Sequence, residues 1–157
     1  MRLLYLNANI LYGECLKQIE GRRWKRSIKT GVCKSLNKQG NCLFTSILTK
    51  LEIVQRLVRE ENCSLTQARS LYELILNTFD ITQISSLNKL NLMTNTFVDI
   101  VLSSNLDFKD ALHLTIASRR NLTIVTHDKK FRQGYSQHRD KLKFYSEVCK
   151  PEDLLDN

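Results

Sequence analysis

Short apolar, strand-like runs alternate in this chain with longer segments of helical periodicity, and this alternation constrains the fold more than any other feature. Strands are expected at residues 2–6, 42–44, 80–85, 122–126 and 143–146. Neighbouring strands separated by helices favour a mostly parallel sheet that is covered on both faces. We therefore expect one α/β domain over residues 1–157, a three-layer α/β/α sandwich, since this length supports a proper core.

The expected helices are marked by apolar residues at helical spacing and by capping signals. They cover residues 10–19, 22–36, a segment from a cap at Thr45 or Ser46 to about 59, 64–77, 87–102, a segment starting at Asp107, and a helical turn at 128–132. The clearest start signal is the capping box Ser64-x-x-Gln67, in which each side chain bonds a backbone N–H at the other end.

A net charge of +8 and a pI near 9.4 indicate a basic protein. Much of the excess lies between residues 17 and 36, which we expect to be largely helical. This segment contains Trp24 and seven basic residues against one acid, including Arg22, Arg23, Lys25 and Arg26. Basic side chains with an aromatic suit phosphate neutralisation and base stacking, so we expect RNA binding that weakens steeply with salt. A solvated helix face or a docking surface for an acidic protein is the alternative.

Composition also indicates the cellular compartment and argues against a zinc-binding or membrane protein. The five cysteines form no C-x-x-C pair, which favours reduced thiols over a zinc site. No stretch approaches the roughly 18 apolar residues of a membrane span, and the N-terminal apolar run stops at Asn7, too early for a signal peptide. We expect a cytoplasmic protein that does not enter membranes.

Four polar residues, Asn7, Glu52, Asp110 and Asp128, stand at the ends of apolar segments or beside them. Each has an ordinary explanation alone, as a turn residue, a helix-rim residue, a first-turn acid or a helix cap, and Asp107 fits an N-cap. Ligands of parallel sheets bind beyond the carboxyl ends of the strands, where Asn7 and Asp128 would lie together. Converging carboxylates stay ionised only beside a cation, and Mg²⁺ prefers such oxygen ligands.

The segments at residues 4–9, 48–53, 110–114 and 125–131 read Leu-Tyr-Leu-Asn-Ala-Asn, Leu-Thr-Lys-Leu-Glu-Ile, Asp-Ala-Leu-His-Leu and Val-Thr-His-Asp-Lys-Lys-Phe. In order and spacing they resemble the PIN-domain family, and more narrowly its VapC-type ribonuclease toxins and their archaeal relatives. The resemblance covers nearly the whole chain.

This resemblance implies hydrolysis of RNA with Mg²⁺ or Mn²⁺ as the cofactor. It implies that Glu52, Asp110 and Asp128 ligate the metal, that Thr126 orients the acidic cluster and that Asn9 holds the loop after the first strand. Lys129 and Arg22 are expected to bind flanking phosphates. The resemblance further suggests a homodimer and a small antitoxin partner. His113, His127 and His138 match no zinc pattern, and we assign structural roles to His113 and His127.

Asn7 departs from the family, which has an aspartate at the matching position. An amide oxygen can ligate Mg²⁺ but brings no charge and cannot accept a proton. Asn7 is therefore either an engineered inactivation of a nuclease or a natural feature of a weakened enzyme. The chain could instead be a non-catalytic RNA-binding module or a structure-specific DNA nuclease.

Overall fold

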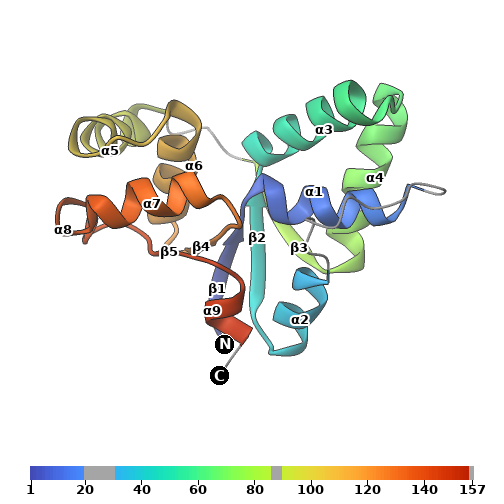
Figure 1. Cartoon of the computed structure of the whole chain (residues 1–157), viewed down its shortest axis with the longest axis horizontal. Helices are drawn as coiled ribbons and strands as arrows, with labels where there is room; N and C mark the ends of the chain where they lie inside the picture. Colours follow the sequence, from blue (N-terminus) through green and yellow to red (C-terminus); the bar gives the residue numbers. More distant parts are fainter. Residues whose placement is uncertain (20–30, 86–89, 156–157) are drawn as a thin grey trace.

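The central sheet is five-stranded and parallel throughout in a computed structural model that describes residues 1–19, 31–85 and 90–155, with side chains described from residue 94 in the last range. Its strands are β1 (Leu3–Leu6), β2 (Cys42–Ser46), β3 (Ile81–Ile84), β4 (Thr123–Val125) and β5 (Val148–Cys149). They lie in the order β3-β2-β1-β4-β5 (Figure 1). The predicted parallel α/β fold is confirmed, and β1 occupies the middle of the sheet.

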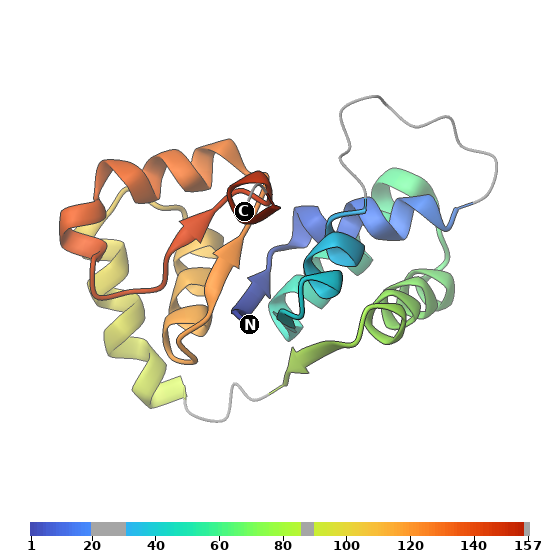
Figure 2. The same cartoon turned by 90° about the horizontal axis from the view of Figure 1, so that it is seen from below.

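Two groups of helices cover the two faces of this sheet (Figures 1 and 2). One group comprises α1 (Ala8–Lys17), α2 (Val32–Lys38), α3 (Ile47–Glu61) and α4 (Leu65–Thr78). The other comprises α5 (Leu90–Ser103), α6 (Phe108–Ser118), α7 (Lys129–Gln137) and α8 (Arg139–Leu142), and the short α9 (Glu152–Leu155) ends the chain.

Alternation along β1 builds a separate core on each face. Leu4 and Leu6 point into a cluster with α1, α2 and α4, whereas Tyr5 points into a second cluster with α6 and α7. All three side chains are fully buried. Successive strand residues face opposite sides of a sheet, so a central strand covered on both faces must be apolar along its whole length.

Several helix starts follow the predicted signals. Ser46 caps α3, and the capping box between Ser64 and Gln67 is present in both directions at α4. Asp107 caps α6, with its side chain accepting the Asp110 N–H at 2.9 Å. Asn7 caps α1, which therefore begins two residues before the expected position.

The expected strand at residues 143–146 is wrong. This segment forms a turn in which Phe144 is 84% exposed, and the edge strand lies further on at β5. β5 pairs with β4, and its apolar residues Val148 and Cys149 lie against the two cores. Pairing with β4 decides which residues form the edge strand.

Two helices also differ from expectation. The helical turn at 128–132 is extended into the nine-residue α7, because Phe131 and Tyr135 lie one turn apart and are both buried. Residues 22–30 of the expected basic helix lie outside the described residues, and α2 starts at Val32, after Gly31. In the described part of the chain, no helix has both the length and the apolar character needed to cross a membrane.

Candidate functional site

The strand ends of β1 and β4 place Asn7 and Asp128 at one edge of the sheet. Leu6 pairs with Val125 in the parallel register, and the Asn7 N–H donates to the Val125 carbonyl at 3.2 Å. Both chains then turn into helices, α1 and α7. The edge is thus formed by two adjacent strand-to-helix junctions, as the sequence predicted.

Asn7 is almost buried, at 5% exposure, and its side-chain oxygen accepts the N–H of Ala8. It thereby caps α1. An N-cap oxygen satisfies one of the backbone N–H groups that have no partner within the helix. The amide therefore has a structural role, and it brings no charge to the edge.

Asp128 caps α7 with one of its two carboxylate oxygens. Its Oδ1 accepts the N–H groups of Lys130 at 2.9 Å and Phe131 at 3.1 Å. Its Oδ2 has no hydrogen bond to the described residues. The half-buried carboxylate can therefore cap its helix and still offer an oxygen to a ligand.

Thr126 and Asn9 tie the loop after β4 to α1. The fully buried Thr126 hydroxyl accepts from Asn9 Nδ2 at 2.9 Å and from the Asp128 N–H at 3.0 Å. Asn9 Oδ1 in turn accepts the His127 N–H at 3.1 Å. Together these three hydrogen bonds hold the backbone at His127 and Asp128 in place relative to α1.

Glu52 reaches the same end of the molecule from α3 and contacts α6. Its Oε1 lies 2.9 Å from Nε2 of His113, which is 1% exposed, and the Glu52 side chain is 19% exposed. The other ring nitrogen of His113 lies 2.7 Å from the Tyr5 hydroxyl. Sequence reasoning missed this contact of His113, since its only signal was a position one helical turn after Asp110.

Asp110 lies half-buried in the first turn of α6, and its carboxylate accepts no hydrogen bond from the described residues. The pKa of Asp110 is raised to about 7, mainly by burial and then by the charges of Asp107, Asp128 and Glu52, in that order of importance. Lys109 opposes this shift in the pKa. The structure therefore brings Glu52 and Asp128 within electrostatic reach of Asp110.

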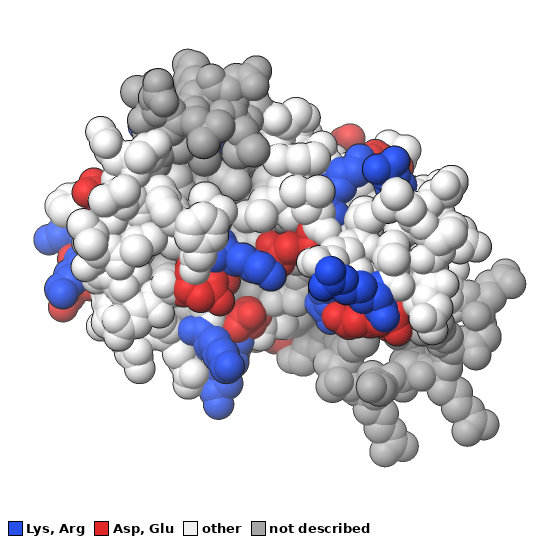
Figure 3. Space-filling view, turned by 90° about the horizontal axis from the view of Figure 1, so that it is seen from above, with Lys and Arg blue, Asp and Glu red and all other residues white. Residues whose placement is uncertain are grey.

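The carboxylates are near one another but are not gathered into a ready cation site. Within residues 1–19, 31–85 and 90–155, no three histidine, cysteine, aspartate or glutamate side chains are grouped so that they could hold one metal ion. Figure 3 looks onto the carboxyl edge of the sheet and shows acidic side chains around a hollow, with lysine and arginine side chains beside them. Carboxylates without a cation repel one another, which opposes closer approach.

The expected phosphate-binding residues divide into two sets. Lys129 is exposed at the start of α7, directly after Asp128, so it lies beside the acidic cluster. Arg22, Arg23, Lys25 and Arg26 lie outside the described residues. The prediction that the basic segment binds RNA stays a prediction.

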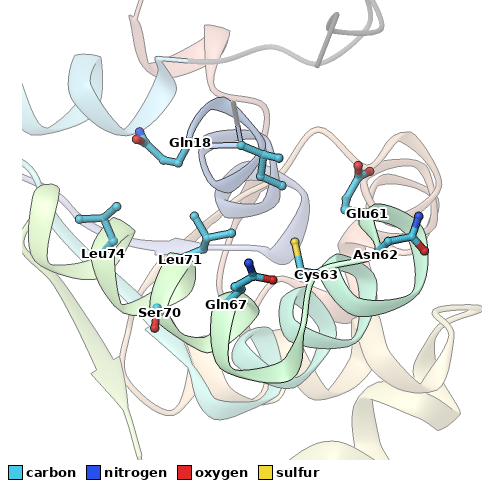
Figure 4. A pocket seen from close by; sticks show the side chains of 9 residues that line it. Gln18, Glu61, Asn62, Cys63, Gln67, Ser70, Leu71 and Leu74 are labelled. Atoms are coloured by element: carbon cyan, nitrogen blue, oxygen red, sulfur yellow. The ribbon is translucent and has the colours of Figure 1, made fainter. Parts of the chain in front are cut away.

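A separate cavity of about 500 Å³ lies near the C-terminal ends of α1 and α3 (Figure 4). Ile19, Leu71 and Leu74 give it apolar walls, and the side chains of Gln67 and Cys63 also line it. Asn62, at its rim, is ten residues along α3 from Glu52, which corresponds to roughly 15 Å of helix. This cavity is therefore distinct from the edge where the carboxylates meet.

Comparison with known proteins gives one family match and several similar folds. The PIN domain family model matches residues 24–135. No curated protein matches the chain.

Two of the similar solved structures are complexes named VapBC. The structure of VapBC2 from Rickettsia felis bound to a DNA fragment from its promoter aligns with a TM-score of 0.61 at 14% identity, covering 94% of this chain and 97% of that one. VapBC-1 from nontypeable Haemophilus influenzae aligns with a TM-score of 0.60 at 12% identity, covering 95% and 98%. PAE2754 from Pyrobaculum aerophilum aligns with a TM-score of 0.54 at 18% identity, covering 98% and 88%. At these identities the likeness concerns the fold.

Proposed function

This chain belongs to the PIN domain family, whose members are generally nucleases, and on that basis we propose that it is built as a metal-dependent endoribonuclease. The observation that carries the proposal is the Asp110 carboxylate. It is half-buried, lacks a hydrogen-bond partner among the described residues, and has a pKa raised to about 7 by burial and by nearby acids. A bound cation would remove that electrostatic cost.

The donor set suits a hard divalent cation such as Mg²⁺ or Mn²⁺, which prefers oxygen ligands. Asp110 offers its carboxylate, and Glu52 and Asp128 each keep one oxygen without a partner among the described residues. Since these groups are not yet arranged around one point, binding would require their side chains to move closer together. Asn7 could add only its neutral amide oxygen, which already caps α1.

When bound, a divalent cation polarises a phosphate oxygen and lowers the pKa of a bound water. The chain contributes the groups around it. Glu52, Asp110 and Asp128 would hold the cation. As the oxygen of the attacking water bonds to phosphorus, one of these carboxylates would take the water's proton. The bond from phosphorus to the leaving ribose oxygen would break, and that oxygen would take a proton from solvent. Lys129 would neutralise a flanking phosphate, a contact that positions RNA without reading its sequence.

Asn7 is the weak point of this proposed enzyme. The family resemblance leads us to expect an aspartate at this position. With Asn7 instead, this edge of the sheet carries one negative charge fewer. Losing a residue that contacts only a metal ligand, and not the metal itself, typically costs 10–100-fold in affinity or activity. Losing a charged ligand should therefore cost at least as much. We propose that the chain as it stands is a weakened or inactive nuclease.

The test compares RNA cleavage in Mn²⁺ by this chain, by Asn7→Asp and by the double variant Asn7→Asp with Asp110→Asn. Cleavage that appears with Asn7→Asp and is lost again in the double variant supports the proposal. Single-stranded DNA serves as a comparison substrate, because equal cleavage of both would contradict the assignment to RNA.

A non-catalytic RNA-binding module is the second candidate, and the neutral Asn7 favours it. RNA binding without cleavage, in both this chain and Asn7→Asp, would support this second function and overturn the first. Electrostatic binding through phosphates should weaken steeply between 50 and 200 mM salt in either case.

We also propose a protein partner, by analogy with the two VapBC neighbours. A small antitoxin would bind this chain and restrain it, and the chain itself would form a homodimer. Light scattering of the purified chain tests the homodimer. Co-purification with the product of any small gene adjacent to its own tests the antitoxin.

A further inference from the structure

A buried line of hydrogen bonds runs from the central strand to Glu52. The Tyr5 hydroxyl lies 2.6 Å from Ser46 Oγ, 3.3 Å from Thr49 Oγ1 and 2.7 Å from His113 Nδ1. All four side chains are at most 1% exposed. His113 then reaches Glu52 through Nε2, at 2.9 Å from Oε1.

Tyr5 and Glu52, the two partners of His113, determine which atom donates and which accepts in each of these hydrogen bonds. Burial raises the pKa of Tyr5 to about 12, so its hydroxyl keeps its proton at neutral pH. A carboxylate can only accept, so the His113 nitrogen facing Glu52 must carry a proton. In the neutral ring the other nitrogen, Nδ1, is an acceptor, and it faces the Tyr5 hydroxyl.

The same assignment of donors and acceptors also fits the contacts of Tyr5 with Ser46 and Thr49. Once Tyr5 donates to His113, its oxygen can accept from the hydroxyls of Ser46 and Thr49. Ser46 Oγ also receives the Thr49 N–H at 3.4 Å, the bond by which it caps α3. The helix that carries Glu52 and the ring that contacts Glu52 are therefore fixed by one tyrosine.

Two consequences follow for Glu52. Its Oε1 is occupied by His113, while Oε2 has no partner among the described residues. His113 and Asp110 lie one turn apart on α6, so the ring that holds Glu52 belongs to the same helix as the neighbouring acid. A carboxylate held through one oxygen loses less rotational freedom when the other binds a ligand.

We propose that His113 is a positioning residue, held by Tyr5 with its proton on Nε2, which orients Glu52 toward the proposed cation. This inference rests on the proposed function for the cation, but the hydrogen-bond line itself does not. Outer partners of metal ligands of this kind fix ligand orientation and affect affinity by about 10–100-fold.

The first experiment needs no variant for its main readout. The chain has three histidines, so nitrogen-15 NMR of the imidazole rings can resolve each of them, with His127→Asn and His138→Asn giving the assignment. We expect the His113 ring to carry a proton on Nε2 and none on Nδ1. A proton on Nδ1 overturns the proposal.

The second experiment measures Mn²⁺ affinity by calorimetry in the full chain. His113→Ala should weaken binding about 10–100-fold. His113→Gln should recover much of that loss, because its amide N–H can still donate toward Glu52. His138→Ala, which removes a histidine at the end of α7, should change nothing.

Folding is checked by the melting temperature of each variant. A folded His113→Ala with unchanged or tighter Mn²⁺ binding, or a His113→Gln no better than alanine, overturns the positioning role. If neither this chain nor Asn7→Asp binds Mn²⁺, the proposed function fails and the positioning role fails with it. The NMR result then still decides the tautomer independently.

Discussion

The junctions β1–α1 and β4–α7 are built alike but differ in charge. Each follows a buried parallel strand, and the two strands are neighbours in the sheet. Asn7 caps one helix with an amide oxygen, and Asp128 caps the other with a carboxylate oxygen. Asn7 is almost buried, whereas Asp128 is half-buried and keeps an oxygen without a partner among the described residues.

The difference between Asn7 and Asp128 separates two requirements. The fold requires a capping oxygen, whereas a bound cation would require a charge. Asparagine and aspartate are about equally good N-caps, since both present an acceptor oxygen to the first turn. Folding therefore accepts either residue at either junction. The charge interacts only weakly with the helix dipole, but at the almost buried position 7 it would also lose hydration and be repelled by the neighbouring acids, so its main benefit lies in what the edge can bind.

Asn7→Asp makes the two junctions equivalent, and we expect the largest effect from it. RNA cleavage in Mn²⁺ should rise by roughly 100-fold or more, because a charged ligand replaces a neutral one. The free energy of unfolding at neutral pH without metal should fall, because the cap is kept but a charge enters an almost buried position beside other acids. Gel-based cleavage assays and urea unfolding measure the two quantities.

Asn77→Asp is the matched control, because it makes the same exchange on an exposed position of α4. Equal cleavage by Asn7→Asp and Asn77→Asp would mean that the charge at the β1–α1 junction has no special role.

Asp128→Asn makes the opposite change, and in the Asn7→Asp background it should lower cleavage about 10–100-fold. Its stability should stay within about 0.5 kcal/mol, because asparagine still caps α7. Asp128→Ala should lower cleavage similarly and also cost about 1 kcal/mol of stability through loss of the cap. Comparable stability losses in both variants would show that the carboxylate itself, and not the capping oxygen, supports the fold.

Much of the fold was predictable because its signals are local. Apolar runs and capping residues lie within one turn or one strand, as at Ser64 and Asp107, and both caps are present. The edge strand was misplaced because only pairing with β4 selects residues 148–149 over the aromatic turn before them. The strand-to-helix ends bearing Asn7 and Asp128 were predictable from topology alone.

The remainder of the site depends on contacts between distant elements. His113 and Glu52 are 61 positions apart, and His113 and Tyr5 are 108 apart. A histidine on the apolar face of a helix gives no sign of its partners. The perturbed pKa of Asp110 was likewise not predictable, since it arises from burial and from charges on other segments.

Thr126→Val tests a side chain of the β4–α7 junction that has no counterpart at the β1–α1 junction. Thr126 accepts hydrogen bonds from Asn9 and from the Asp128 N–H, and valine would leave both donors without a partner. Stability should fall by about 1–3 kcal/mol, measured by urea unfolding. Thr123→Val, at the start of β4, should cost less than about 0.5 kcal/mol, since Thr123 is partly exposed and valine suits a strand. Equal costs at the two positions would contradict a special role for Thr126.

Asp110→Asn should change stability with a sign opposite to that of most substitutions. The pKa of Asp110 is raised to about 7 in the folded chain, so the folded state holds its proton more tightly than the unfolded state. The associated stability is fully present below about pH 4 and is lost as the pH rises through 7. At pH 8 the asparagine variant should therefore be more stable by about 1 kcal/mol, after discounting for the exposed part of the carboxylate.

The same variant connects this stability difference to the proposed cation. Asp140→Asn, an exposed position on α8, is the control, and its stability should match that of the unsubstituted chain throughout this range of pH. Adding Mn²⁺ at pH 8 should raise the melting temperature of the chain with Asp110 and leave Asp110→Asn nearly unchanged, because a ligand stabilises only the state that binds it. If the carboxylate destabilises the metal-free fold and Mn²⁺ reverses this, the charge is retained at Asp110 for binding. A less stable Asp110→Asn at pH 8 would instead mean that the charge supports the fold, as the oxygen of Asp128 does at its own junction.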